Sequence, residues 1–307
     1  MVLKKDYKKK PLMVGTTGKK PRKTAFDFVN VFLLVGFAFI CFYPLVYVLA
    51  GSFNQGKDYI NGGIWLWPRV FSTENYYVVL NDPRLWKSYG ITIARTIIGT
   101  ISGVLFTALV AYPMSRPKLI GKRVFYYIFI FTMFFSGGLI PFFWVILTIG
   151  LFDSFWVYII PALFSVYNML VFVNFFKTIP EEIHESAVMD GASELKIFLR
   201  IILPLSTPVI ATVGLWIAVG HWNSFFDTMI YTSNNNLWTL QYYLMKVIKE
   251  ASLPPASGAL PPEFLENIAP ETVSLASIVV SVIPIFVFYP FIFKSLTSGV
   301  IIGSLKG

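Results

Sequence analysis

The sequence is poor in the residue types on which most enzyme active sites depend. Its 307 residues include one cysteine and two histidines, and only 13% of them are charged. With Cys41 as its single cysteine, the chain has no internal disulfide. It also contains no Gly-rich P-loop, no His-Glu-x-x-His motif and no nucleophile elbow. The sequence therefore predicts no catalytic residues, no metal site and no cofactor on this chain.

Apolar residues, by contrast, are abundant. Hydrophobic residues make up 56% of the chain, and the aromatic residues include 30 Phe, 16 Tyr and 8 Trp. Soluble domains carry roughly 25% charged residues, about twice the fraction found here. Aromatic rings suit both lipid-facing surfaces and the headgroup level of a bilayer. The composition indicates that lipid is the solvent of this chain.

Six apolar runs are long enough to cross a bilayer, which takes about 20 residues. They cover 26–50, 89–112, 124–149, 155–176, 203–226 and 273–293. Gly137, Gly138 and Pro141 are expected to kink the third run, and the prolines of the sixth are tolerated within a bundle. The first run is longer than the apolar core of a signal peptide. The sequence thus predicts an all-α membrane protein with six transmembrane helices.

The basic residues determine the predicted orientation of these helices. Lys and Arg near the ends of spans stay on the cytoplasmic side. With the N-terminus inside, 18 of the 25 Lys and Arg residues fall in inner segments, nine of them in the first 25 residues. Both termini are therefore predicted to be cytoplasmic. The net charge of +9 is therefore explained by the membrane topology and does not indicate a nucleic-acid-binding site.

The domain organisation follows from this topology. A basic cytoplasmic tail covers residues 1–25, a six-helix transmembrane domain 26–294 and a cytoplasmic C-terminal tail 295–307. Two outer segments, 51–88 and 230–272, are long, and the second contains Pro254, Pro255, Pro261 and Pro262. Within it, residues 239–250 have the pattern of an amphipathic surface helix. We expect the second outer segment to contact an extracytoplasmic partner.

The cytoplasmic segment between the fourth and fifth spans, residues 178–203, reads as two short helices. Pro180 suits the first turn of a helix, and Glu181 and Glu182 favour the positive end of its dipole. Gly191 supplies a turn before the second helix. Two amphipathic helices on the cytoplasmic face form a projecting knob that suits a groove in another protein. From the residues alone, a connector on the membrane surface is an equally good reading.

A spaced motif within this segment favours the interpretation as a projecting knob that docks into another protein. It consists of Glu185-Ser186-Ala187, three residues, Gly191, nine residues and Ile201-Ile202-Leu203-Pro204. This resembles the coupling-helix signature of ABC importer permeases, EAA, three residues, G, nine residues, I-x-L-P. The spacing agrees throughout, and the one departure is Ser186 in place of alanine. The resemblance implies an ATPase-coupling site formed by Glu185, Ser186, Ala187, Asp190, Gly191, Ala192, Leu203 and Pro204.

The resemblance covers most of the chain after the N-terminal tail. The chain is similar to the second permease of maltose-type importers, within the carbohydrate branch. Its C-terminal residues resemble those of the polysaccharide and complex-oligosaccharide group. The residues that carry this similarity are Asn75-Tyr76, Trp222-Asn223, 296–300 and 303–307.

This resemblance implies a type I importer fold and a set of partners. These are a second permease in a heterodimer, two ATPase subunits that bind ATP and Mg²⁺, and an extracytoplasmic binding protein that delivers a saccharide. The implied location is a bacterial plasma membrane. The tail, including Gly299, Lys306 and Gly307, is implied as a further ATPase contact.

Polar residues within the spans are candidates for the translocation path. Polar groups in membranes are costly and often mark a pathway, which directs attention to His221, Trp222 and Asn223. Interhelical hydrogen bonding that only holds the bundle together is an equally good interpretation. Arg95 lies within the second span, and Asp227 is a candidate partner for it.

Two other classes of protein fit the sequence less well. An ion-coupled secondary transporter or channel would need ion sites near mid-membrane and usually an inverted repeat, and the sequence has neither feature. A membrane-embedded enzyme would need clustered histidines or acids at one membrane face. The sequence favours the permease subunit of an ATP-driven importer, with the secondary transporter as the alternative.

Overall fold

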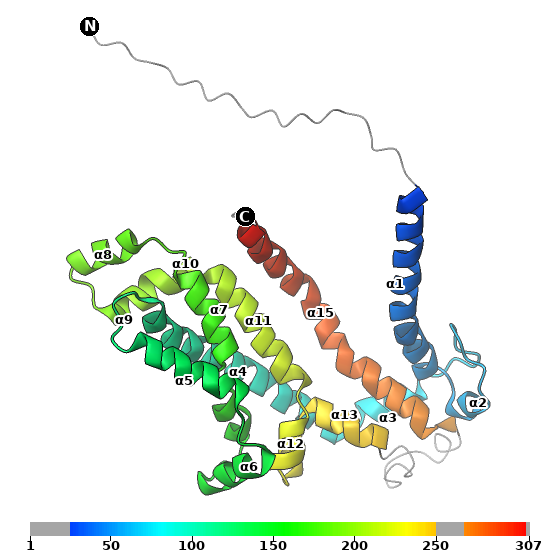
Figure 1. Cartoon of the computed structure of the whole chain (residues 1–307). Coiled ribbons are helices and arrows are strands. Elements are labelled where there is room, and N and C mark those ends of the chain that lie inside the picture. The colour runs from blue at the N-terminus through cyan, green and yellow to red at the C-terminus, as the bar shows by residue number, and fades with distance from the viewer. Residues whose placement is uncertain (1–24, 250–266, 305–307) are drawn as a thin grey trace. The chain divides into compact units, whose positions relative to one another are not determined.

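The computed structural model describes residues 25–249 and 267–304, and every regular element in those ranges is helical (Figure 1). A single bridge pairs Asn54 with Phe71. The α-helices are α1 (Ala25–Ser52), α2 (Gly56–Ile60), α3 (Glu74–Leu80), α4 (Pro83–Ser115), α5 (Lys122–Phe134), α6 (Leu139–Thr148), α7 (Val166–Phe176), α8 (Glu181–Met189), α9 (Glu194–Ile197), α10 (Leu203–Leu205), α11 (Thr207–Asn223), α12 (Phe226–Tyr231), α13 (Leu240–Lys249) and α15 (Pro270–Ser304). The other helical turns are η1 (Phe155–Tyr158), η2 (Ile160–Ala162), η3 (Phe198–Ile202) and η4 (Asn235–Leu237). The prediction of an all-α protein is confirmed for these residues.

The helices that are long and apolar enough to cross a membrane fall into two groups. Three are continuous, namely Ala25–Ser52, Pro83–Ser115 and Pro270–Val287. Three further candidates are bent pairs: α5 with α6 at 111°, η1–η2 with α7 at 48°, and α9–α10 with α11 at 84°. Length and composition therefore allow three spans, or up to six if each bent pair crosses once.

The bends have local causes. The expected kink in the third apolar run is present at Gly137 and Gly138, and Gly138 has a φ of 87°, a conformation that suits glycine. Two further breaks, one in the fourth apolar run and one near the start of the fifth, were not predicted. In the fourth run, Pro161 lies in the turn η2, and Ser165 then begins α7 by accepting a hydrogen bond from the Asn168 N–H at 3.4 Å.

The chain divides into two compact units, residues 1–46 and 47–307. The described part of the first unit is the N-terminal portion of α1, whose side chains are almost all exposed and apolar. Exposed Phe, Leu, Val and Ile side chains on one continuous helix suit contact with lipid or with another membrane protein.

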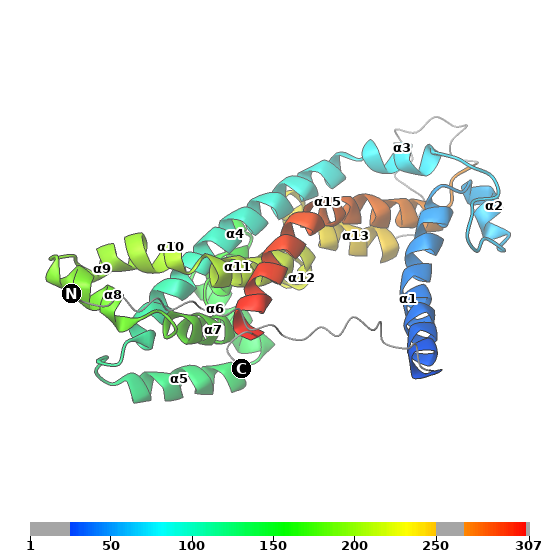
Figure 2. The same cartoon turned by 90° about the horizontal axis from the view of Figure 1, so that it is seen from above.

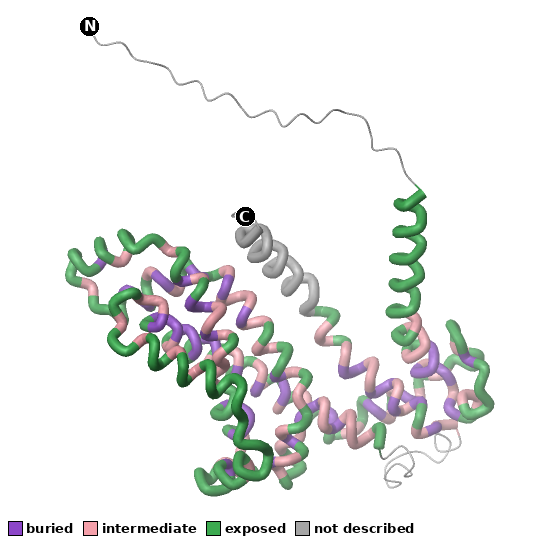
Figure 3. The backbone as a smooth tube through the Cα atoms, in the orientation of Figure 1, coloured by how far each residue is buried: buried purple, intermediate pink, exposed green. Residues whose placement is uncertain are grey.

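In the second unit, α4 packs against α7 and α11 (Figure 2). Small residues on α4 allow this close approach. A Cβ on Gly99 would overlap the His221 ring of α11, and one on Gly103 would meet the Ile217 side chain at 3.4 Å. Glycines spaced by four residues permit helix backbones to approach closely in membranes. The buried residues of α4, α7 and α11 form the largest core, which continues into residues 178–203 (Figure 3).

The outer segments contain more helix than the sequence indicated. Segment 51–88 includes α2, α3 and the first turns of α4, which begins at Pro83 because the Asp82 carboxylate accepts a hydrogen bond from the Arg84 N–H at 2.8 Å. The helix expected at 239–250 is present as α13. At the other end of the chain, α15 continues to Ser304, past the predicted boundary at residue 294. The prolines at 254–262 lie outside the described residues.

Candidate functional site

The coupling segment, residues 178–203, folds as α8, a tight turn and α9, and it lies at one end of the second unit (Figure 1). Gly191 makes the turn with a φ of +74°. Its N–H donates to the Val188 carbonyl at 2.9 Å, and the Ala192 N–H donates to the Ala187 carbonyl at 3.0 Å. This pair of hydrogen bonds is the Schellman motif, which closes a helix with a left-handed residue, usually glycine. The prediction that Gly191 supplies the turn is confirmed.

The two faces of α8 differ in exposure. Ala187 is buried and packs into the core shared by α4, α7 and α11, with Ala192 partly buried beside it. Glu185, Ser186 and Asp190 are exposed on the outside. Met189, at the end of the helix, is 87% exposed. A single helix thus presents small residues to the bundle and a methionine flanked by carboxylates to the outside.

The second half of the motif leads the chain from α9 into α11. Pro204 has no N–H, so the Arg200 carbonyl cannot receive the usual helical hydrogen bond, and residues 198–202 widen into the π-helix η3. Phe198 and Ile202 are buried there, while Leu203 packs on the same core. The helix then bends at the buried Ser206. Leu203 and Pro204 therefore shape the junction between coupling segment and bundle.

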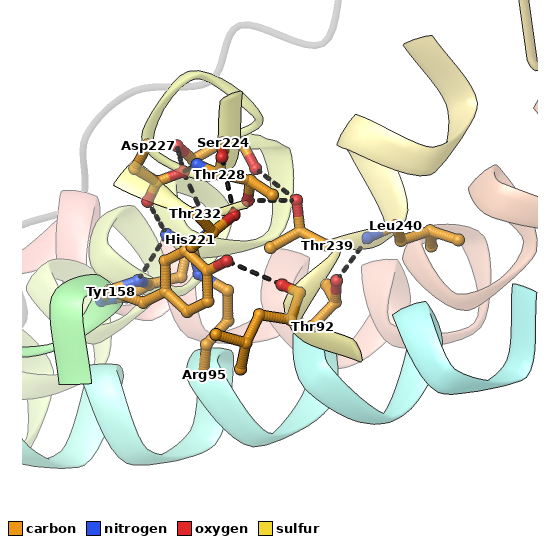
Figure 4. A network of polar contacts seen from close by, with 11 residues as sticks. Thr92, Arg95, Tyr158, His221, Ser224, Asp227, Thr228, Thr232, Thr239 and Leu240 are labelled. Carbon is orange, nitrogen blue, oxygen red and sulfur yellow. Dashed lines mark hydrogen bonds and ion pairs between the residues drawn. The ribbon is translucent and has the colours of Figure 1, made fainter. Parts of the chain in front are cut away.

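A buried polar cluster surrounds Arg95 of α4, whose side chain is only 2% exposed (Figure 4). Its guanidinium pairs with both carboxylate oxygens of Asp227, with Nη1 donating to Oδ1 at 3.2 Å. The guanidinium carbon also lies 4.5 Å from the centre of the Tyr158 ring. The predicted pairing of Arg95 with Asp227 is confirmed. In a low-dielectric setting, this bidentate pair satisfies a charge that would otherwise be costly.

The cluster joins several elements by further hydrogen bonds (Figure 4). The Thr92 hydroxyl of α4 accepts from the Leu240 N–H at 2.8 Å, which fixes the start of α13. The Thr228 and Thr239 hydroxyls are 2.9 Å apart. The Tyr158 hydroxyl donates to the Leu237 carbonyl at 2.7 Å. These contacts attach the second outer segment to α4 and η1, and no periodic pattern in the sequence predicts them.

The three candidates for a translocation path have different surroundings. His221 is buried, with Nδ1 3.5 Å from Arg95 Nη2, and its ring packs on Gly99. Trp222 packs against the separate cluster of α3, α4, α13 and α15. Asn223 is exposed at the end of α11. The structure does not bring the three side chains together.

The first outer segment is organised by Asn75, which is 1% exposed. Its amide nitrogen donates to the Ser52 and Asn54 carbonyls at 3.0 and 2.8 Å. Its amide oxygen accepts from the Thr272 hydroxyl at 2.8 Å. One side chain thus ties the end of α1 to the start of α15.

The remaining predicted sites can be placed only in part. Gly299 lies within α15, while Lys306 and Gly307 are outside the described residues. Across residues 25–249 and 267–304, no group of three or more His, Cys, Asp or Glu side chains is arranged to hold a metal ion.

An all-helical chain with long apolar helices and a projecting coupling segment has the features of an importer permease, and comparison with known proteins identifies the family. Residues 96–296 match the family described as "Binding-protein-dependent transport system inner membrane component". The match spans more than half of the chain, so the chain belongs to this family. The expectation of an ABC importer permease is confirmed.

Two relatives from Bacillus subtilis (strain 168) are similar over nearly their whole length. Protein LplC is 37% identical, covering 92% of this chain and 95% of the relative. The polygalacturonan/rhamnogalacturonan transport system permease protein YtcP is 36% identical, covering 92% and 98%. The chain is also similar to a chain in the crystal structure of a bacterial ABC transporter involved in the import of the acidic polysaccharide alginate. That match has a TM-score of 0.81 and 33% identity, and it covers 90% of this chain and 99% of the other.

Proposed function

We propose that this chain is one permease half of an ATP-driven saccharide importer in a bacterial plasma membrane. The observation that carries the proposal is the coupling segment, where Gly191 closes α8, and Glu185 and Met189 are exposed on that helix. A rigid helix end with an exposed thioether and nearby carboxylates suits an apolar cleft with basic residues at its rim. We assign this cleft to a separate ATPase subunit, which binds ATP and Mg²⁺.

The proposed topology has six spans and two cytoplasmic termini. In this arrangement each bent pair crosses the bilayer once, and α9 forms the cytoplasmic end of the third pair. α8 then lies on the cytoplasmic side with the basic ends of the spans. The outer segments then lie on the opposite side, where we propose that residues 230–272 contact an extracytoplasmic binding protein. The exposed apolar surfaces of α1 and α5 suit contact with lipid and with a second permease.

The proposed substrate class is a saccharide. Several relatives are named for saccharide transport, including YtcP and the arabinooligosaccharides transport system permease protein AraQ of Halalkalibacterium halodurans. The solved neighbour belongs to a transporter of an acidic polysaccharide. A panel of oligogalacturonides, alginate oligosaccharides and neutral arabinooligosaccharides would define the class by stimulation of ATP hydrolysis in reconstituted vesicles.

The direct test is co-purification of the tagged chain with an ATPase subunit from its own cells. Wild type and the control Glu271→Ala, an exposed carboxylate at the start of α15, should retain the ATPase. Glu185→Ala should retain roughly one tenth as much, because a charge-assisted hydrogen bond contributes on the order of 1.5 kcal/mol. If wild type retains no ATPase, the proposal fails and a secondary transporter becomes the better reading.

A further inference from the structure

Five side chains form a closed ring of polar contacts between the end of α4 and the two helices of the coupling segment. They are Tyr112 and Arg116 of α4's C-terminal end, Glu181 and His184 of α8, and Glu194 of α9. We propose that this five-residue ring positions the coupling segment on α4, so that movement of α8 is transmitted to that span. The proposal rests on the function proposed above and adds the residues that connect docking to the bundle.

One half of the ring is anchored by Tyr112, which is only 6% exposed. Its hydroxyl donates to Glu194 Oε2 at 2.7 Å and accepts from Arg116 Nη2 at 3.0 Å. The guanidinium carbon of Arg116 also lies 4.6 Å from the centre of the Tyr112 ring. Because the tyrosine ring is packed in the main core, its hydroxyl is held at a fixed place. α9 is thereby hydrogen-bonded to a rigid part of α4.

The other half of the ring holds α8. Arg116 Nη1 donates to Glu181 Oε2 at 3.4 Å, and His184 Nδ1 is 3.9 Å from Glu181 Oε1. His184 Nε2 lies 3.0 and 3.2 Å from the two oxygens of Glu194. Because the Glu194 carboxylate can only accept, Nε2 is the donor in that contact. His184 therefore connects α8 to α9 on the face opposite the exposed Met189.

The surroundings of the ring explain why it would transmit movement. α8 reaches the core mainly through the small side chain of Ala187, and a methyl group alone resists sliding poorly. The ring adds contacts at two points of α8, one turn apart. Glu181 contacts Arg116 at the end of α4, and His184 contacts Glu194 of α9, which is itself hydrogen-bonded to Tyr112 of α4. Lys122 Nζ further fixes that end by donating to the Arg116 carbonyl at 2.6 Å. Directional contacts at two points resist both tilting and rotation of α8.

The ring also separates docking from transmission. Tyr112 is buried, and Arg116 and His184 are partly buried, while Glu181 and Glu194 are exposed at the edge of the ring. Glu185 and Met189 are exposed and take no part in the ring. Tyr112→Phe and Glu194→Gln should therefore leave ATPase capture unchanged. Each should reduce saccharide-stimulated ATP hydrolysis roughly three- to tenfold, the range expected for loss of one net hydrogen bond. Tyr112→Phe removes the hydroxyl, whereas Glu194→Gln removes the charge and leaves one acceptor oxygen for Tyr112 and His184. Because both changes weaken the same contact, the double variant should lose less than the product of the two single losses.

A distance measurement tests positioning without any saccharide. Spin labels at Trp86→Cys, in the first turn of α4, and Glu182→Cys, on α8, both occupy exposed positions, and Cys41→Ser removes the native thiol. In the assembled transporter, the distance between the labels should be narrowly distributed with or without ATP and Mg²⁺. Glu194→Gln should broaden this distribution, and the control Glu271→Gln, at an exposed carboxylate outside the coupling segment, should not.

The outcomes separate this inference from the proposed function. If wild type captures no ATPase, both fail. If wild type captures and stimulates the ATPase while Tyr112→Phe and Glu194→Gln match it in stimulation and in label distance, only the ring inference is overturned. A parallel loss of capture and stimulation would indicate a folding defect in place of a transmission role, and would also overturn it.

Discussion

Breaking the Arg95–Asp227 pair should destabilise the protein asymmetrically. The Arg95 side chain is 2% exposed, whereas that of Asp227 is 22% exposed. Asp227→Asn strands a buried guanidinium, and loss of one partner of a buried pair costs about 3–5 kcal/mol. Arg95→Met leaves a carboxylate that still accepts from the Ser224 hydroxyl and the Thr228 N–H, each at 2.9 Å. The cost of this second variant should be about 1–3 kcal/mol.

The double variant Arg95→Met/Asp227→Asn removes both charges. Replacing a buried ion pair by uncharged groups of similar volume is often close to neutral. The double variant should therefore be more stable than Asp227→Asn alone.

Thermal unfolding of the solubilised transporter, followed by size-exclusion chromatography after heating, would measure all three variants. The reasoning is refuted if Arg95→Met is the more damaging single change, or if the double variant is at least as unstable as Asp227→Asn. A control substitution at Lys87, an exposed basic residue on the same helix, should leave the unfolding temperature unchanged.

Two further predictions follow from local geometry. Gly191→Val should weaken ATPase capture roughly 5- to 30-fold in a pull-down titration, because a left-handed conformation costs a non-glycine residue about 1–2 kcal/mol. No atom lies within 4 Å of an added Cβ, so the effect is conformational and Gly191→Asn should be milder. Equal loss in both variants would contradict this conformational argument. At Asp82, burial raises the pKa, but hydrogen bonds from Arg84 and Tyr243 and the charge of Arg84 together outweigh burial and hold the pKa below 3.8. Asp82 therefore stabilises the fold above pH 3.8, and this contribution is lost as pH falls through the lowered pKa. A stability-versus-pH curve for Asp82→Asn should lack that acid-side decline. An unchanged curve would contradict the assignment of the decline to Asp82.

The helices and the coupling turn were predictable because their signals are local. Apolar runs of the required length mark α1, α4 and α15, and the glycine pair at 137–138 marks the bend between α5 and α6. Gly191 was predictable as a turn, since its spacing from Glu185 belongs to a known motif. Arg95 and Asp227 were paired correctly because an isolated charge in a span demands a partner.

Other features depend on contacts that sequence order does not reveal. The five-residue ring joins residues up to 82 positions apart, as between Tyr112 and Glu194. Each of its members has an ordinary interpretation as an exposed charge or a packed aromatic residue. His221, Trp222 and Asn223 are adjacent in sequence, yet a helix turns each toward a different neighbour. The spacing of Gly99 and Gly103 was a usable signal for the close packing of α4 and α11.

The pairing of Arg95 with a residue 132 positions later has a consequence for biosynthesis. At roughly 5–20 residues per second, Asp227 leaves the ribosome about 7–26 s after Arg95. During that interval α4 carries an uncompensated charge, which costs about 2.5–3.5 kcal/mol at the centre of an inserting helix. The Ile, Leu and Val residues around it must offset this cost. The Arg95 charge is therefore compensated only when the chain around α12 arrives, which links the order of synthesis to the order of assembly.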